Sequence, residues 1–271
     1  MEEIRVASGL IWIMAISGIL VAITPICILW YLKNHMEITM APILLGFACY
    51  VAFSMILANI AGQMTAEIHN VLAHTGVMTL LLTGLAICAI FIGLRSLNKP
   101  GTNSSAAFLF AAGYTAFEAW SLAIGHFTKA AMLGNVNTLL MDQTPQAQEE
   151  ILQQVVNIAS MSYFDNLVFA LSGVGLVVSI FAITMLVWMY VRGNVKALAL
   201  VVAVAGMFII KALQMLNQNG LIAPFLTLLT IAAVTVFIFS ITRSAYNRYL
   251  NDIKLGKTAK GPQKPDIRDV L

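Results

Sequence analysis

Seven long apolar stretches constrain the fold of this chain more than any other feature. Each holds about 20 residues or more and is almost free of charge. A helix needs about 20 apolar residues to cross the hydrocarbon core of a bilayer, because each residue advances the helix by about 1.5 Å. The stretches are residues 8–31, 41–61, 75–95, 105–128, 167–191, 196–217 and 220–243. The sequence therefore predicts an all-α, polytopic membrane protein with about seven transmembrane helices.

Composition and connection lengths support one membrane domain. Hydrophobic residues make up 60% of the chain and charged residues 10%, which excludes a soluble globular domain. Apart from residues 129–162, the connections between the stretches are short. We expect a single transmembrane domain at residues 1–243 and a basic tail at residues 244–271. The first stretch is too long for the core of a secretory signal, so we interpret it as a retained helix.

The basic residues predict the orientation of the chain. With seven spans, one set of connections holds only Arg5 and Lys129. The other set holds Lys33, Arg95, Lys99, Arg192, Lys196, Arg243 at the end of the last stretch, and the tail residues Arg248, Lys254, Lys257, Lys260, Lys264 and Arg268. Loops rich in Lys and Arg stay in the cytoplasm, so the N-terminus should lie outside and the C-terminus inside. We expect a multi-pass protein of the plasma membrane whose partner is the lipid bilayer. We expect no nucleic-acid partner, because the net charge of +3 reflects topology and forms no nucleic-acid-binding stripe.

The long connection, residues 129–162, carries its own helix signal. Thr144 can cap a helix, Pro145 suits its first position, and Glu149 and Glu150 suit its first turns. An apolar stripe follows at helical spacing, formed by Ile151, Leu152, Val155, Ile158 and Ala159. We predict an interfacial helix that lies on the outer surface of the membrane.

The connection at residues 62–74 is polar, but its pattern does not predict a metal site. Glu67, Asn70 and His74 share one helical face, and His69 lies off that face. Zinc needs three or four convergent ligands, typically with paired histidines one helical turn apart. These two histidines are five positions apart, so ordinary surface polarity explains the segment better.

Glu118 is the first candidate for a functional residue. It lies near the middle of an apolar segment, and an acidic residue at the centre of a membrane helix costs roughly 2.5–3.5 kcal/mol. Lys211 lies at a comparable depth in the sixth stretch, so an ion pair between Glu118 and Lys211 is geometrically allowed. Alternatively, Lys211 extends outward and Glu118 bonds to Thr115 or Ser121. The sequence leaves both arrangements open.

Two other polar residues complete a candidate catalytic set. His126 follows Glu118 by two helical turns, toward the outer surface, and Asp165 lies at the start of the fifth apolar stretch. If the chain is an enzyme, Glu118, His126 and Asp165 are its candidate catalytic residues, with His69 or His74 added from the outer connection.

Several segments carry a resemblance to a known family. They are Trp30-Tyr31-Leu32-Lys33, Ala41-Pro42-Ile43-Leu44-Leu45-Gly46 with Phe53 and Ile56, Gly93-Leu94-Arg95-Ser96-Leu97, Gly113-Tyr114-Thr115-Ala116-Phe117-Glu118-Ala119, and Asp165-Asn166-Leu167-Val168-Phe169-Ala170. Together they resemble the YhfC family over about the first five spans. That family comprises polytopic proteins regarded as intramembrane metalloproteases, related to the CAAX-protease and PrsW group.

The motifs of that family are altered here. Its Glu-Glu-x-x-Arg motif on the third span corresponds to Ala86-Ile87-Cys88-Ala89-Ile90, and its motif histidine on the fourth span corresponds to Tyr114. Its Glu-Arg pair becomes Asp165-Asn166, and a later histidine falls near Ser172 or Gly173. Glu118 alone is unchanged, with Asp165 as a shortened carboxylate. The resemblance thus implies a protease-like fold from which most metal ligands have been lost.

Three functions follow, in order of preference. The first is a catalytically degenerate homologue that binds or scaffolds another membrane protein and needs no cofactor. The anterior-pharynx-defective subunit of gamma-secretase offers an analogy for this role at the level of fold. The second is an active intramembrane metallopeptidase with zinc at a displaced site around Glu118. The third is a small-solute transporter that uses Glu118 and Lys211.

Overall fold

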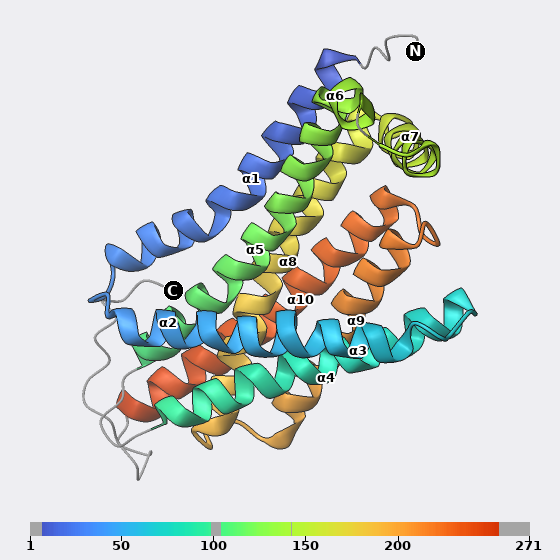
Figure 1. The fold of residues 1–271 in the computed structure, drawn as a ribbon. Coiled ribbons are helices and arrows are strands. Elements are labelled where there is room, and N and C mark those ends of the chain that lie inside the picture. The colour runs from blue at the N-terminus through green and yellow to red at the C-terminus, as the bar shows by residue number, and fades with distance from the viewer. Residues whose placement is uncertain (1–6, 99–103, 142, 255–271) are drawn as a thin grey trace.

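The computed structural model describes residues 7–98, 104–141 and 143–254, and this part of the chain is built from helices (Figure 1). Seven helical spans among these residues are long and apolar enough to cross a membrane, which confirms the predicted all-α, polytopic class. The elements are α1 (Ser8–Lys33), α2 (Met40–Cys49), η1 (Tyr50–Leu57), α3 (Ala58–Thr65), α4 (Val71–Leu97), α5 (Ser104–Gly134), α6 (Val136–Met141), α7 (Pro145–Ala159), α8 (Tyr163–Val191), α9 (Ala197–Gln218) and α10 (Pro224–Lys254).

Helices α5 and α8 form the centre of the bundle, and most of their apolar residues are buried. Helix α1 packs on both of them, and α10 packs on α8 and α9. Helix α4 packs against α9 and against the second span, which runs across α5 (Figure 1). Residues near the middle of α5 are therefore enclosed by other helices on several sides.

Two glycines allow the second span to cross α5 at very short range. A β-carbon added to Gly46 of α2 would collide with the backbone carbonyl of Phe110, and one added to Gly113 of α5 would collide with the carbonyl of Ile43. Small residues let membrane helices approach until their backbones touch. Both glycines belong to segments that carry the family resemblance. This crossing fixes where the rest of the second span lies against α5.

The middle of the second span, η1, is a π-helix rather than the regular helix that its hydropathy suggested. A π-helix bonds each residue to the fifth one along the chain, is uncommon, and is frequent at functional sites. Tyr50 and Ser54 lie within this segment. Its altered register decides which side chains of the second span face α5.

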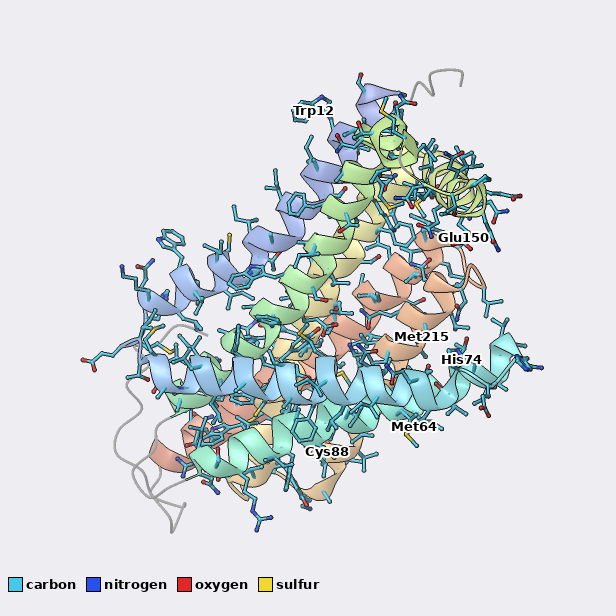
Figure 2. The ribbon with its side chains drawn as sticks, viewed as in Figure 1. Trp12, Met64, His74, Cys88, Glu150 and Met215 are labelled. Atoms are coloured by element: carbon cyan, nitrogen blue, oxygen red, sulfur yellow. The ribbon has the colours of Figure 1, made fainter. Side chains whose placement is uncertain are left out.

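The predicted helix in the long connection exists as α7. The Thr144 side chain caps it by accepting a bond from the Ala147 N–H at 3.4 Å, and Pro145 is its first residue. Val155 and Ile158 are buried, and the apolar stripe packs on α1, α5 and α6. Ala159, the last residue of the predicted stripe, is exposed. Glu150 of α7 is exposed (Figure 2). The position of α7 at a membrane surface stays a prediction.

Two predicted helix ends differ most from the structure. Helix α5 continues to Gly134, whereas hydropathy placed its end at residue 128. The charge of Lys129 lowers the hydropathy there, yet its ammonium lies 5.7 Å from the centre of the Phe169 ring, and Leu133 beyond it is buried. Helix α10 continues to Lys254, so the predicted tail begins as helix. Residues 255–271 of that tail lie outside the described residues.

Candidate functional site

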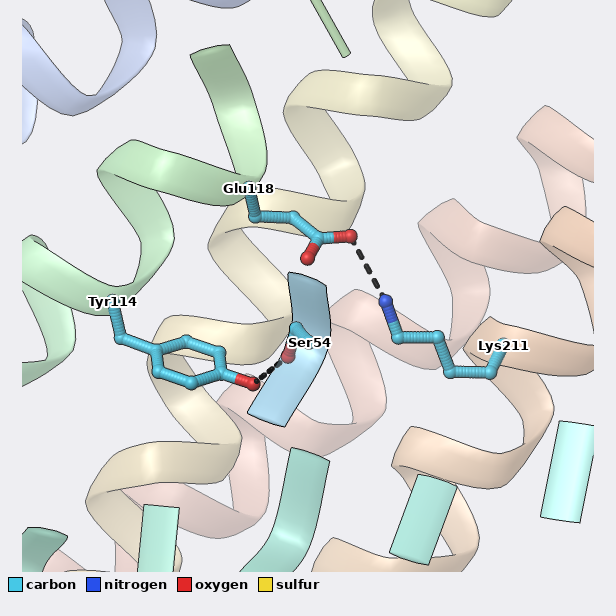
Figure 3. Close-up of polar contacts among 4 residues, drawn as sticks. All are labelled: Ser54, Tyr114, Glu118 and Lys211. Atoms are coloured by element: carbon cyan, nitrogen blue, oxygen red, sulfur yellow. Dashed lines mark hydrogen bonds and ion pairs between the residues drawn. The ribbon is translucent and has the colours of Figure 1, made fainter. Parts of the chain in front are cut away.

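Glu118 lies on α5 with only 5% of its surface exposed, and its carboxylate faces Lys211 of α9. The Lys211 Nζ atom donates to Glu118 Oε1 at 2.9 Å (Figure 3). Each residue lies 14 positions after the first residue of its helix, Ser104 or Ala197, which corresponds to about 21 Å along the axis. The structure therefore pairs the two charges at matching depth.

Of the two alternative partners of Glu118, Thr115 is engaged elsewhere and Ser121 lies nearby. The Thr115 hydroxyl donates to the backbone carbonyl of Ala111 at 2.8 Å, within its own helix. Ser121 lines the same cavity as Glu118. The Lys211 side chain points inward, toward α5, and does not extend outward to the membrane surface (Figure 3).

The π-helical segment contributes two hydroxyl groups beside this pair, those of Tyr50 and Ser54. The Ser54 and Tyr114 hydroxyls lie 3.0 Å apart (Figure 3). The Tyr50 ring meets the Tyr114 ring edge to face at 5.3 Å between centroids. Tyr50 also interacts through its side chain with Glu118 and Ser121. The Glu118 carboxylate is thus surrounded by hydroxyl groups as well as by the ammonium of Lys211.

These side chains border a cavity of about 190 Å³ between α4, α5, α9 and η1. Its lining consists of Tyr50, Ser54, Leu82, Leu85, Glu118, Ser121, Leu122, Lys211, Gln214 and Met215. At about 30 Å³ per molecule the cavity has room for roughly six waters, and it offers enough polar groups to bind them. It is small compared with ordinary ligand sites, which measure about 300–1,000 Å³. A hydrated ion pair fits this space better than a large substrate.

The structure does not bring His126 and Asp165 to Glu118. His126 is half-buried two turns further along α5, about 12 Å along the axis, and does not line the cavity. Asp165 lies in the first turn of α8, where its carboxylate accepts from the Ser162 hydroxyl at 2.8 Å and the Ser162 N–H at 3.3 Å. This is a capping box, which satisfies the exposed N–H groups of a helix start.

The outer histidines also lie away from Glu118. His69 is exposed in the turn before α4, and His74 lies in the first turn of α4, at the far end of the α3–α4 hairpin (Figure 2). Across residues 7–98, 104–141 and 143–254, no group of three or more His, Cys, Asp and Glu side chains could hold a metal ion. The polar groups around Glu118 are hydroxyls, an amide and an ammonium. This set does not fit the zinc ion that the resemblance implies.

The positions that the resemblance matches to the family motifs have structural roles in this fold. Tyr114 is bonded to Ser54, and Ile87 packs against the main core. The Asn166 side chain donates to the Ser162 carbonyl at 3.0 Å. A β-carbon at Gly173 would lie 3.1 Å from Val21, so this position serves the contact between α8 and α1. Each of the four positions contributes to packing or hydrogen bonding.

Sequence reasoning missed three polar side chains of the cavity, namely Tyr50, Ser54 and Gln214. A partial signal existed, because Tyr50 and Ser54 are two hydroxyl residues four apart in an apolar stretch. Gln214 follows Lys211 by three positions and therefore shares its helix face. The π-helical register that turns Tyr50 and Ser54 toward α5 has no comparable signal.

Comparison with known proteins extends the resemblance beyond the first five spans. The family model described as YhfC intramembrane metalloprotease matches residues 19–236, from within α1 into α10. No curated protein and no solved structure matches the chain. Glu118 and Lys211 both lie inside the matched region, which covers well over half of the sequence. The chain therefore belongs to the YhfC family of intramembrane metalloproteases.

Proposed function

We propose that this protein is a catalytically inactive member of its family that acts by binding another integral membrane protein. The observation that carries this proposal is the ion pair between Glu118 and Lys211, at 2.9 Å. By the resemblance to the family motifs, Glu118 is the one candidate catalytic residue that the chain keeps unchanged. Its carboxylate is bound by a lysine ammonium, which supplies the positive charge that a metal ion would otherwise supply.

Electrostatics supports this proposal. A divalent ion bound to Glu118 would lie close to the Lys211 ammonium. Two unit like charges about 4 Å apart repel each other by ~4 kcal/mol in a partly polar protein environment, and a divalent ion doubles that repulsion. Ligands such as histidine or a second carboxylate would have to offset it, and the cavity lining contains none.

The expected membrane placement is part of the proposal. The asymmetry of basic residues supports a plasma-membrane protein whose N-terminus lies outside and whose C-terminus lies in the cytoplasm. In this orientation α7 and the short helix α6 lie on the outer side, with α7 close to the membrane surface. The inner face then carries the connections with Arg95 and Arg192.

Family membership favours one other candidate, an active metallopeptidase. Such an enzyme would have to separate Lys211 from Glu118 and recruit His126 or an outer histidine as a ligand. His126 gives this candidate its one specific support, because its Nδ1 atom is buried without a hydrogen-bond partner among the described residues. The two candidates differ in whether function requires the Glu118 carboxylate.

A complementation experiment separates them. The double variant Glu118→Gln with Lys211→Met removes both charges while keeping similar side-chain volumes, so it should fold. The double variant is expressed in cells that lack the native gene. If the protein is an inactive binding protein, this variant should reverse the deletion phenotype as well as the wild type does. The same variant should keep the membrane complex that the wild type forms, measured by cross-linking in intact membranes.

The control for this experiment is the amount and thermal stability of the double variant. Rescue that fails although the variant is present at wild-type levels and equally stable would show that the carboxylate is needed for chemistry. That result would overturn the proposal and favour the metallopeptidase.

A further inference from the structure

A second cavity lies between α1 and α10 and shares no lining residue with the Glu118 cavity. It measures about 440 Å³ and is lined almost entirely by apolar and aromatic side chains. Cys27 and Tyr31 of α1 form one wall, Phe108 and Phe181 form the floor, and Phe239 of α10 forms the other wall. The groove exists because α1 and α10 both pack on α8 without closing over it.

A smaller cavity of about 60 Å³ continues this groove toward the C-terminal half of α10. It shares Phe108, Phe181 and Phe239 with the larger cavity and ends at Arg243 and Tyr246. The two cavities form one apolar groove, which we call the α1–α10 groove. Among the described residues that line it, Arg243 is the one lysine or arginine, and His35 borders the larger cavity.

The depth of Arg243 matches the level of lipid headgroups. It lies 19 residues after Pro224, the first residue of α10, and 19 residues of helix extend about 29 Å. The hydrocarbon core is about 30 Å thick, so a chain that enters the bilayer at Pro224 reaches the opposite headgroups at Arg243. Tyr31 and Tyr246 also line the groove, as aromatic residues do at such interfaces.

Arg243 is exposed, and within the described residues no carboxylate pairs with it. An exposed guanidinium at headgroup level, above an apolar groove that opens into the bilayer, has the charge and position to bind a phosphate group. The groove below it has the chemistry to take an acyl chain, because its lining is almost entirely apolar.

We propose that the α1–α10 groove binds an anionic phospholipid, with one acyl chain against Phe108, Phe181 and Phe239 and the phosphate on Arg243. The lipid comes from the leaflet that surrounds the C-terminal half of α10. It fills the space between α1 and α10 and so completes the packing of the bundle on that side. This binding site is independent of the Glu118–Lys211 pair and of the proposed function.

Native mass spectrometry of the full chain in mild detergent tests this proposal, with phosphatidylglycerol and phosphatidylcholine as probes. Arg243→Gln should weaken phosphatidylglycerol binding roughly tenfold, as expected for the loss of one charged hydrogen-bonded contact, and change phosphatidylcholine binding less. Arg248→Gln is the matched control, because it removes the same charge from an exposed position of the same helix outside the groove.

A second variant tests the acyl chain. Val178 lines the groove, and Val178→Phe should fill it and weaken the binding of both lipids, whereas Val236→Phe on the exposed face of α10 should not. Equal losses in Arg243→Gln and Arg248→Gln would reduce the effect to general surface charge and overturn the proposal. Unchanged lipid binding in Val178→Phe would overturn it as well. Cross-links from a photoreactive residue at position 178 to the chain's own residues 255–271, in place of lipid, would assign the groove to the tail instead.

Discussion

The Nζ atom of Lys211 and the Oε1 atom of Glu118 lie 2.9 Å apart, although the two residues are 93 positions apart in sequence. Helix α5 packs chiefly on α1, α2 and α8, whereas α9 packs on α4, α8 and α10. The two helices share α8 as a main neighbour, and the lysine side chain bridges the cavity that separates them. This bond links the α4–α9 side of the molecule to the central helix.

Removing one member of this pair should destabilise the protein strongly. Lys211→Met leaves the Glu118 carboxylate without its partner, and breaking a buried pair in this way costs about 3–5 kcal/mol. Adding Glu118→Gln should recover much of that loss, because neither charge then remains. Thermal unfolding in detergent of the wild type, the two single variants and the double variant measures the coupling. Strictly additive effects would show that the two side chains do not interact.

The purified protein should contain no stoichiometric zinc. The reason is that the polar groups around Glu118 are hydroxyls, an amide and an ammonium, with no histidine or second carboxylate in the cavity lining. Metal analysis after purification in mild detergent, with and without added zinc, measures this directly. Glu118→Gln serves as the comparison and should give the same background value. One zinc per chain in the wild type that disappears in Glu118→Gln would refute the assignment.

The crossing of α2 and α5 should tolerate no added methyl group. Gly113→Ala places a β-carbon against the Ile43 carbonyl, so one of the two backbones must move. Overpacking of this kind destabilises by about 1–3 kcal/mol. Gly125→Ala is the control in the same helix, because a β-carbon added there would meet nothing within 4 Å. That substitution should be neutral or stabilise by up to about 1 kcal/mol. Similar unfolding temperatures for the two variants would argue against this crossing.

The orientation can be tested by labelling single cysteines in intact cells. In a background that lacks Cys27, Cys49 and Cys88, a membrane-impermeant maleimide should modify Glu150→Cys, which lies on the exposed side of α7 (Figure 2). It should leave Lys260→Cys in the tail unmodified until the cells are permeabilised. The reverse pattern would place the C-terminus outside and contradict the positive-inside assignment.

Hydropathy and local end signals were enough to predict the spans and α7. A stretch of about 20 apolar residues has few alternatives to a membrane helix, and Thr144 with Pro145 marks a helix start by local chemistry alone. The depth estimate that matched Glu118 with Lys211 also worked, because helical rise is constant. It could not decide whether the two side chains turn toward each other, since that depends on how α5 and α9 are rotated.

The surroundings of Glu118 could not be predicted in the same way. Tyr50 and Ser54 face α5 because a π-helical segment shifts their register and because Gly46 and Gly113 set the crossing. Both effects depend on contacts between distant segments, which local patterns do not encode. For Asp165, by contrast, a local sequence pattern did indicate its structural role. Its carboxylate looked like a degraded catalytic group, whereas Ser162, three residues earlier, already carried the signal for a capping box.

The Glu118–Lys211 pair also constrains how this sequence can change over evolutionary time. Replacing either residue alone leaves a single charge inside the membrane, so one-step intermediates are disfavoured. The two positions should therefore vary together among descendants of this chain: both charged or both neutral. A lineage could not acquire a metal at Glu118 by gaining histidines one at a time, because Lys211 would have to be lost in the same period. The lysine thus makes a stepwise change from an ion pair to a metal site at Glu118 unfavourable.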